Sequence, residues 1–181
     1  MKGAAVWLYD YFKFNRVAYE NLQFDLNFIA KNDYDGAINV KKGDKIPFVH
    51  IPSGTDLTPC SVLKTFTKFY RDYPEFIKSG GVMPIVCCSY LLYPEYYPLY
   101  KANGNLQKFV DLFNVYDIEK REKFDNGWRV FNMVATEYSA DLPETTSLQR
   151  SFKEYMKAGK PHGEGWGMLL FNGSKVIKEK I

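Results

Sequence analysis

The stretch FVHIPSGTDLTP, residues 48–59, decides the fold, because it predicts a strand, a tight turn and the first turn of a helix in direct succession. The strand ends at a proline, Gly54 supplies the turn, and Thr58 followed by Pro59 is typical of a helix N-terminus. Apolar residues at helical spacing predict that the helix covers residues 59–72. The face expected to be buried consists of Val62, Phe66, Phe69 and Tyr73.

The bulk composition is that of one packed domain. Of the 181 residues, 46% are hydrophobic and 17% aromatic, which excludes a disordered chain. The net charge is only +3 and the basic residues are scattered, so we expect no nucleic-acid partner. No apolar run is long enough to span a membrane, and we expect no membrane partner. Three cysteines, two of them adjacent, favour reduced thiols and a cytoplasmic protein.

Other apolar stretches predict the remaining strands of a mixed sheet. NLQFDLNF alternates apolar and polar residues, as in a strand with one buried face. MPIVCCS is almost continuously apolar, as in a strand inside a sheet. The expected strands cover residues 21–28, 46–51, 83–89, 128–135 and 166–171. A hairpin is expected at KKGD, residues 41–44, between AINV and KIPFVHI.

Three further segments have helical patterns. We expect helices over residues 4–16 and 145–159, and a helix in two pieces over residues 93–113. The glycine-rich GKPHGEGWG, residues 159–167, predicts a turn. The whole chain, residues 1–181, is therefore expected to be a single α/β (α+β) domain with helices flanking a mixed central sheet.

The turn between strand and helix is a candidate anion site. The first N–H groups of a helix have no partner within the helix, and the helix dipole adds positive potential there. Gly54 lets the backbone approach a phosphate, and Ser53, Thr55 and Thr58 offer hydroxyl groups. The stretch has neither the lysine of a P-loop nor the three glycines of a dinucleotide motif, so an ordinary capped helix start is the alternative.

The remaining candidates for chemistry are few. His50 is a possible general base, although a single strand histidine is more often a packing residue. Cys87 and Cys88 point to opposite faces of their strand, and Cys88 is a possible nucleophile beside His50. The two histidines form no ligand cluster, so no metal is expected. The tyrosines of residues 93–100 are too many to be fully buried with their hydroxyl groups satisfied, and we expect them to line a groove or an interface.

Several of these motifs together resemble one family. NRVAYENLQFD, VHIPSGTDLTP, VCCSYLLYP, TTSLQRSFKEYMKAG and GEGWGMLLF are similar to successive blocks of the GNAT-like C-terminal domain of uncharacterised bacterial acyltransferase domain-containing proteins. The resemblance covers roughly residues 5–172. It implies the acyl-CoA N-acyltransferase fold and a preceding N-terminal domain, so the chain is expected to be the second half of a longer protein or a stand-alone version.

The resemblance also implies a function. Acetyl-CoA or another acyl-CoA would be the acyl donor, with its pyrophosphate on Ile51, Ser53, Gly54, Thr55 and Thr58, and an amine would be the acceptor. His50 is the candidate proton acceptor, and Tyr90 or Tyr93 the candidate acid for the departing thiolate. Where related sequences read Cys-His-Ser-Trp, this chain reads Cys87-Cys88-Ser89-Tyr90. The alternatives are a non-catalytic ligand-binding or regulatory module, and a cysteine-based acyl carrier or hydrolase acting through Cys88.

Overall fold

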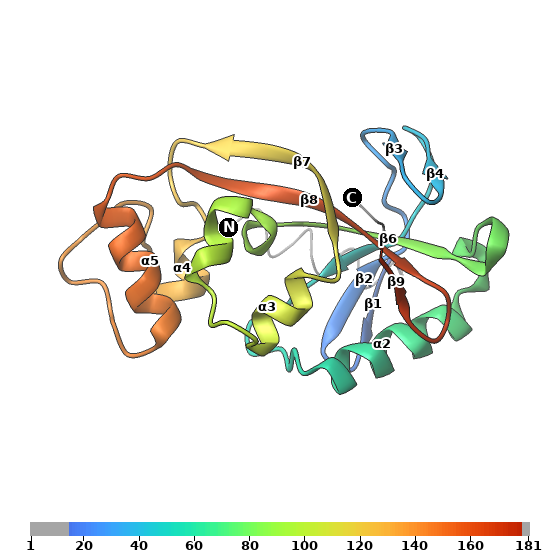
Figure 1. The fold of residues 1–181 in the computed structure, drawn as a ribbon, viewed down its shortest axis with the longest axis horizontal. Coiled ribbons are helices and arrows are strands. Elements are labelled where there is room, and N and C mark those ends of the chain that lie inside the picture. The colour runs from blue at the N-terminus through green and yellow to red at the C-terminus, as the bar shows by residue number, and fades with distance from the viewer. Residues whose placement is uncertain (1–14, 179–181) are drawn as a thin grey trace. The chain divides into compact units, whose positions relative to one another are not determined.

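The computed structural model describes residues 15–178, which fall into two units of strands and helices (Figure 1). The described residues up to Cys87 and from Met168 onward form the first unit, and Cys88–Gly167 form the second. Strands β6 (Met83–Ser89) and β8 (His162–Phe171) contribute residues to both units. The mixed α/β class expected from the sequence is confirmed.

The sheet of the first unit contains both parallel and antiparallel neighbours. Its strands follow the order β1, β2, β5, β6, β8, and β9 pairs with β8. Strands β1 and β5 each run antiparallel to β2, whereas β5 and β6 are parallel neighbours through Phe48 and Val86. The strands not yet delimited are β1 (Arg16–Tyr19), β2 (Leu22–Asp25), β5 (Phe48–His50) and β9 (Val176–Ile177).

Helix α2 (Pro59–Asp72) packs its predicted apolar face on this sheet. Phe24 of β2 is fully buried and stacks on Phe69, with ring centroids 3.9 Å apart and planes 11° from parallel. Phe66 meets Phe24 edge-on at 6.1 Å, and Tyr73, at the helix C-cap, stacks on Phe69 at 4.8 Å. Burial of these rings supplies much of the stability of the unit, because each aromatic side chain removes a large apolar area from water. Figure 1 shows α2 alongside β1 and β2.

The expected hairpin at residues 41–44 is wrong in its pairing. The turn itself forms, with the Asp44 N–H donating to the Lys41 carbonyl at 2.9 Å. After the turn, however, Lys45 bridges Ile29 and does not pair with β4. Strand β4 (Asn39–Val40) instead pairs with β3 (Tyr34–Asp35) in a separate two-stranded sheet. Short-range alternation could not distinguish these two partners, because both are antiparallel and close in sequence.

The expected helix over residues 4–16 lies outside the described residues except at its end. Arg16 is not helical there but begins β1, a strand that the sequence analysis missed. Glu20 and Asn21 form the two-residue connection to β2, with Glu20 at φ +51°. Tight hairpin turns of this kind need positive φ, and they more often carry glycine or asparagine, so the turn was hard to predict.

The second unit has a core of stacked aromatic rings between its helices. Helix α5 begins with a capping box in which Thr146 and Gln149 satisfy each other's backbone N–H groups, and its buried face includes Phe152. The Phe152 ring stacks on Phe124 at 5.1 Å and meets Tyr96 edge-on at 4.8 Å. Strand β7 lies beside β8 (Figure 1). The elements of this unit besides β6 and β8 are η3 (Tyr90–Leu92), η4 (Pro94–Leu99), α3 (Asn105–Val110), β7 (Asn114–Arg121), α4 (Gly127–Phe131) and α5 (Ser147–Lys157).

The expected strand over residues 128–135 is wrong. Its first residues belong to α4, and Asn132 ends this helix in the left-handed conformation. The apolar residues of α4 pack on α5 instead of lying in a sheet, and the Gln149 side chain donates to the Val130 carbonyl at 3.1 Å. A short apolar run fits either a buried strand or a buried helix, and here helix packing decided the outcome.

The expected turn at residues 159–167 is only partly correct. The chain turns at Gly159, which has φ +62°, but it becomes strand β8 from His162 onward. The glycines inside β8 stand where another segment passes very close. A Cβ on Gly165 would lie 2.1 Å from the Leu92 carbonyl oxygen, and one on Gly163 would lie 2.5 Å from the Tyr93 ring. The glycines therefore mark close backbone approach and not a loop.

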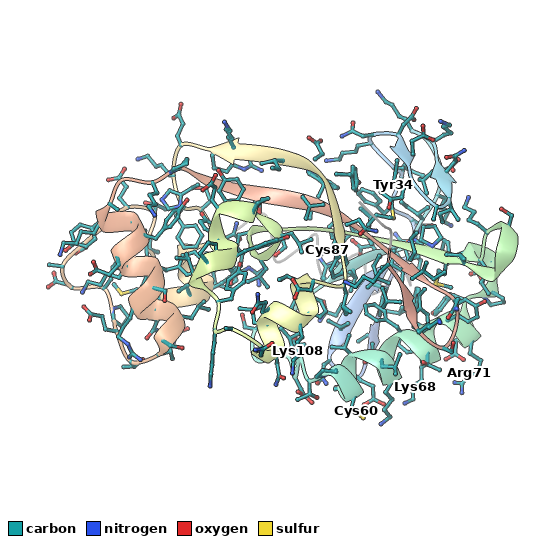
Figure 2. The ribbon with its side chains drawn as sticks, viewed as in Figure 1. Tyr34, Cys60, Lys68, Arg71, Cys87 and Lys108 are labelled. Carbon is teal, nitrogen blue, oxygen red and sulfur yellow. The ribbon has the colours of Figure 1, made fainter. Side chains whose placement is uncertain are left out.

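Two short 3₁₀ helices, η1 (Pro74–Phe76) and η2 (Ser79–Gly81), connect α2 to β6. Within residues 15–178, no helix is long and apolar enough to cross a membrane. The same residues contain no group of three histidine, cysteine or acidic side chains placed to hold a metal ion. All three cysteines lie in this range and form no disulfide bond. Figure 2 labels Cys60 at the start of α2 and Cys87 on β6.

Candidate functional site

The turn between β5 and α2 has the form expected of a type II β-turn. The Thr55 N–H donates to the Pro52 carbonyl at 3.3 Å, and Gly54 adopts φ +78°. In a type II turn the third residue needs positive φ, which is the conformation that favours glycine. A Cβ on Gly54 would meet no atom within 4 Å. The turn geometry alone therefore explains the glycine, and the space above it is open.

Two of the three hydroxyl groups predicted to face an anion already donate to the protein. The Thr55 hydroxyl lies 2.6 Å from the Pro52 carbonyl oxygen and 3.0 Å from that of Asn21. The Thr58 hydroxyl donates to Asp56 at 3.0 Å. The Ser53 side chain is exposed and has no hydrogen bond among residues 15–178. An anion at this turn would therefore bind mainly to backbone N–H groups.

Thr58 occupies the N-cap position of α2, as predicted, but its side chain does not cap the helix. Instead the Asp56 carboxylate accepts both the Thr58 backbone N–H, at 2.9 Å, and the Thr58 hydroxyl. The backbone hydrogen bond from Thr58 is the main cause that lowers the pKa of Asp56. An ionised carboxylate therefore stands beside the positive end of the helix. Pro59 has no N–H, so Cys60 and Ser61 carry the first N–H groups of the helix.

His50, at the end of β5, belongs to a charged cluster that crosses three strands. Its Nε2 atom lies 2.7 Å from Oδ2 of Asp25 on β2. Arg16 on β1 donates to both oxygens of the same carboxylate, from Nε to Oδ1 and from Nη2 to Oδ2 at 2.9 Å. The Arg16 side chain is 6% exposed, and the Asp25 and His50 side chains are 24% and 23% exposed. The paired geometry of the guanidinium fixes the carboxylate in place.

Strand register explains why these side chains meet. Arg16 is directly opposite Asp25, and Gln23 is directly opposite His50, so all four side chains lie on one face of the sheet. Phe24, between Gln23 and Asp25, lies on the other face, against α2. The Gln23 Oε1 atom is buried and has no hydrogen-bond partner among residues 15–178. The sequence analysis missed Asp25 and Arg16 as site residues, because their roles depend on this pairing.

The Asp25 carboxylate is ionised at neutral pH. Burial alone would raise its pKa, but the hydrogen bonds and charges of His50 and Arg16 outweigh burial and lower the pKa of Asp25 to about 2. An ionised carboxylate only accepts hydrogen bonds, so Nε2 of His50 carries the hydrogen in this contact. A neutral His50 then has its lone pair on Nδ1.

The other predicted catalytic residues lie in the second unit. Cys88, on β6, is half-buried. Tyr90 is buried and meets Phe124 edge-on at 5.8 Å, and burial raises the pKa of Tyr90 to about 12. Tyr93 is also buried, its pKa is raised mainly by burial, and it meets Tyr96 edge-on at 5.0 Å. The hydroxyl groups of Tyr90 and Tyr93 have no hydrogen-bond partner among residues 15–178, and both are protonated at neutral pH.

The tyrosines of residues 93–100 are not all fully buried with satisfied hydroxyl groups, as expected, since Tyr97 is half-buried and the Tyr93 hydroxyl makes no hydrogen bond within residues 15–178. Tyr93, Tyr96 and Tyr100 are 2%, 0% and 6% exposed. The Tyr100 hydroxyl donates to the Leu91 carbonyl at 3.0 Å, and the Tyr96 hydroxyl lies 2.7 Å from Nδ1 of His162. The second histidine of the chain thus satisfies a buried tyrosine, and the three buried tyrosines of this segment are core residues.

The fold and this corner define a class of protein, and comparison with known families names it. The family model for the GNAT-like C-terminal domain matches residues 18–169, so the chain belongs to this family. A search among curated proteins gives no match.

Solved structures agree on the fold. An acyltransferase in complex with decanoyl-CoA matches with a TM-score of 0.68 and 20% sequence identity, over 90% of this chain and 48% of that chain. An acyltransferase in complex with CoA and 10C-teicoplanin matches with a TM-score of 0.67 and 19% identity, over the same shares. At this identity the likeness concerns the fold, and this chain spans about half the length of those proteins.

Proposed function

We propose that this chain is an acyl-CoA-dependent N-acyltransferase domain, which transfers an acyl group from CoA to an amine. The observation that carries the proposal is the corner in which β5 ends at His50, turns at Gly54 and enters α2. The chain belongs to the GNAT-like family, and solved proteins of the same fold were crystallised with acyl-CoA. A strand that leads through a turn into a helix N-terminus is also a general anion site.

The acyl donor would bind at this corner through its pyrophosphate. The backbone N–H groups of Cys60 and Ser61 would be the main donors, because they begin the helix and have no partner within it. The turn backbone from Ile51 to Thr55 would contribute the remaining N–H groups. Among the hydroxyl groups, that of Ser53 is exposed and makes no hydrogen bond in the described chain, so it needs no rearrangement.

His50 would accept the proton that the amine must lose. The amine nitrogen attacks the thioester carbonyl carbon, a C–N bond forms, the C–S bond breaks and CoA leaves as a thiolate. The proton released from nitrogen passes to Nδ1 of His50 and then through solvent to the thiolate, which balances the reaction. The candidate acids Tyr90 and Tyr93 belong to the second unit and are buried, so this scheme gives them no step.

A non-catalytic module is the second candidate, and one observation favours it. The Asp56 carboxylate stands at the N-terminus of α2 and accepts two hydrogen bonds from Thr58, where a pyrophosphate would bring further negative charge. If Asp56 keeps this position, the corner repels CoA and the domain holds another ligand or a partner domain.

Binding and turnover separate the two candidates. Thermal unfolding is measured with CoA, acetyl-CoA and decanoyl-CoA, because a ligand that binds only the folded state raises the melting temperature. Turnover is then measured with each acyl-CoA and a panel of primary amines. Because Cys60 is exposed, a thiol reagent would label the protein as well as CoA, so CoA release is followed by chromatography.

The outcomes are distinct. Stabilisation with turnover, lost in His50→Gln, supports the acyltransferase. Stabilisation without turnover for any acceptor supports a module that binds CoA without chemistry, and it contradicts repulsion of CoA by Asp56. No stabilisation by any CoA compound contradicts the acyltransferase and agrees with a module whose Asp56 carboxylate repels CoA. A mass increase of one acyl group on the protein, absent in Cys88→Ser, would instead support a cysteine carrier.

A further inference from the structure

We infer that Asp25 and Arg16 are positioning residues for the transfer reaction, and that they hold His50 in the tautomer that presents Nδ1 to the amine. This inference rests on the proposed function and deepens it. Neither residue touches the reacting atoms in this scheme, since both act through the imidazole. The site is thus a three-residue chain that runs across β1, β2 and β5.

The contact with Asp25 determines the tautomer of the His50 imidazole. The contact between His50 Nε2 and Asp25 Oδ2 is 2.7 Å, which is a short hydrogen bond. Asp25 is ionised, so the hydrogen of a neutral imidazole must lie on Nε2 and the lone pair on Nδ1. An imidazole with the opposite tautomer would place its lone pair against the carboxylate and could not accept a proton from the amine.

Positive charge develops on His50 during the reaction, next to the Asp25 carboxylate. When Nδ1 takes the proton from the amine, the ring becomes an imidazolium, and the neighbouring carboxylate stabilises this charge. The charged groups that face His50 from the neighbouring strands β1 and β2 are Arg16 and Asp25. Arg16 would weaken the effect of a lone carboxylate, but it also keeps Asp25 ionised and fixed in two hydrogen bonds.

The orientation of the His50 ring is also restricted by its neighbours. The Phe48 ring packs against the His50 ring with centroids 4.7 Å apart, on the strand that carries both. Together with the bond to Asp25, this contact restricts rotation of the imidazole. A fixed base contributes to catalysis because the geometry for proton transfer exists before the amine arrives.

The inference is tested first without activity, by the tautomer of His50 in the 181-residue chain. Two-bond ¹H–¹⁵N spectra of the ¹⁵N-labelled protein distinguish Nε2–H from Nδ1–H, and His50→Gln identifies the signals of His50, because the chain has only two histidines. We expect Nε2–H in the unmodified chain above the pH at which the ring protonates. In Asp25→Asn the new amide donates to Nε2, and we expect the population to shift towards Nδ1–H.

Kinetics test the role in the reaction. We expect Asp25→Asn to lower kcat by about 10²–10⁴-fold, the usual contribution of a working general base, while KM for acyl-CoA changes by less than about threefold. The acid limb of the pH–rate profile should move to lower pH, because the imidazolium loses its counter-charge. Asp25→Glu, which keeps the carboxylate, should recover part of the rate.

The matched control is Asp72→Asn. Asp72 also pairs with an arginine in the first unit, Arg71, at 2.7 Å, but it lies at the end of α2, and the Figure 2 label marks Arg71 there. This variant should leave the rate and the His50 tautomer unchanged.

Each outcome decides the inference. Nδ1–H in the unmodified chain overturns it, and this measurement needs no variant to fold. Unchanged kcat and an unchanged pH profile in Asp25→Asn also overturn it, while leaving the acyltransferase itself intact. If the unmodified chain has the Nε2–H tautomer but no turnover with any acyl-CoA and amine, the proposed function fails, and the positioning role in catalysis fails with it.

Discussion

Replacing Gly54 tests the corner between β5 and α2 most directly. The residue has φ +78° in a turn, and the space where a Cβ would stand is empty. The effect on stability therefore comes from the backbone alone. A non-glycine residue at positive φ costs about 1–2 kcal/mol, and the less flexible unfolded chain offsets about 0.4–1 kcal/mol of this. We expect Gly54→Ala to lose about 1 kcal/mol, roughly a fivefold change in the folding equilibrium constant.

Asparagine and valine at position 54, which are similar in size, distinguish backbone strain in the turn from steric obstruction of the ligand. Asparagine tolerates positive φ whereas β-branched valine does not, so Gly54→Val should be the less stable of the two in urea denaturation. If the turn backbone approaches a pyrophosphate, both variants should lose most of their affinity for CoA in calorimetric titration, with far-UV circular dichroism unchanged. Equal stability of the Asn and Val variants would refute the argument from φ. CoA affinity equal to that of the unmodified chain in both would show that the corner is only a connection.

Three other predictions concern stability. Phe24→Ala should lose about 3–5 kcal/mol in urea denaturation, because Phe24 is fully buried between Phe66 and Phe69; a loss below about 1 kcal/mol would contradict this packing. The lowered pKa of Asp25, about 2 against an ordinary 3.8, contributes stability that is complete above about pH 4 and is lost as the pH falls towards 2. This contribution to the free energy of unfolding is about 2 kcal/mol. When the free energy of unfolding is measured against pH, the Asp25→Asn variant should not show this loss in acid. Lys153 is buried and donates to the Ala140 and Leu142 carbonyls and to Glu144, at 2.6, 2.9 and 2.6 Å, so Lys153→Met should cost about 2 kcal/mol and increase hydrogen exchange in residues 138–146, whereas unchanged exchange would refute this clamp.

Local patterns predicted the elements whose signals were strong. The helix over residues 59–72, with its proline at the first position and its aromatic face, is confirmed as α2. The capping residues of α5 were likewise visible, and the structure shows that Thr146 and Gln149 form a capping box. In both helices the local preference and the packing agree, which is why the sequence was sufficient.

Elements that depend on distant partners were not predicted. Strand β7 has mostly half-exposed side chains and little alternation, so no apolar pattern indicated it. Helix α4 was mistaken for a strand, because an apolar run of this length does not reveal what it packs against. The same distinction applies to the residues of the candidate site. His50 could be named from its chemistry, but Asp25 and Arg16 could be named only from the register of β1, β2 and β5.

The alternating glycines of β8 have a consequence for how this chain tolerates substitution. Added methyl groups at Gly163, Gly165 and Gly167 would collide with Tyr93, Leu92 and Phe113. The side chains of Glu164 and Trp166, between these glycines, lie on the opposite face of the strand. They make hydrogen bonds to side chains on that face. In a saturation mutagenesis scan of β8, the tolerance to substitution should therefore alternate from one position to the next. Every second position should accept only the smallest residue. Insertion of one residue in this strand would move the glycines and the large side chains to each other's faces. The large side chains would then collide with the neighbouring backbone.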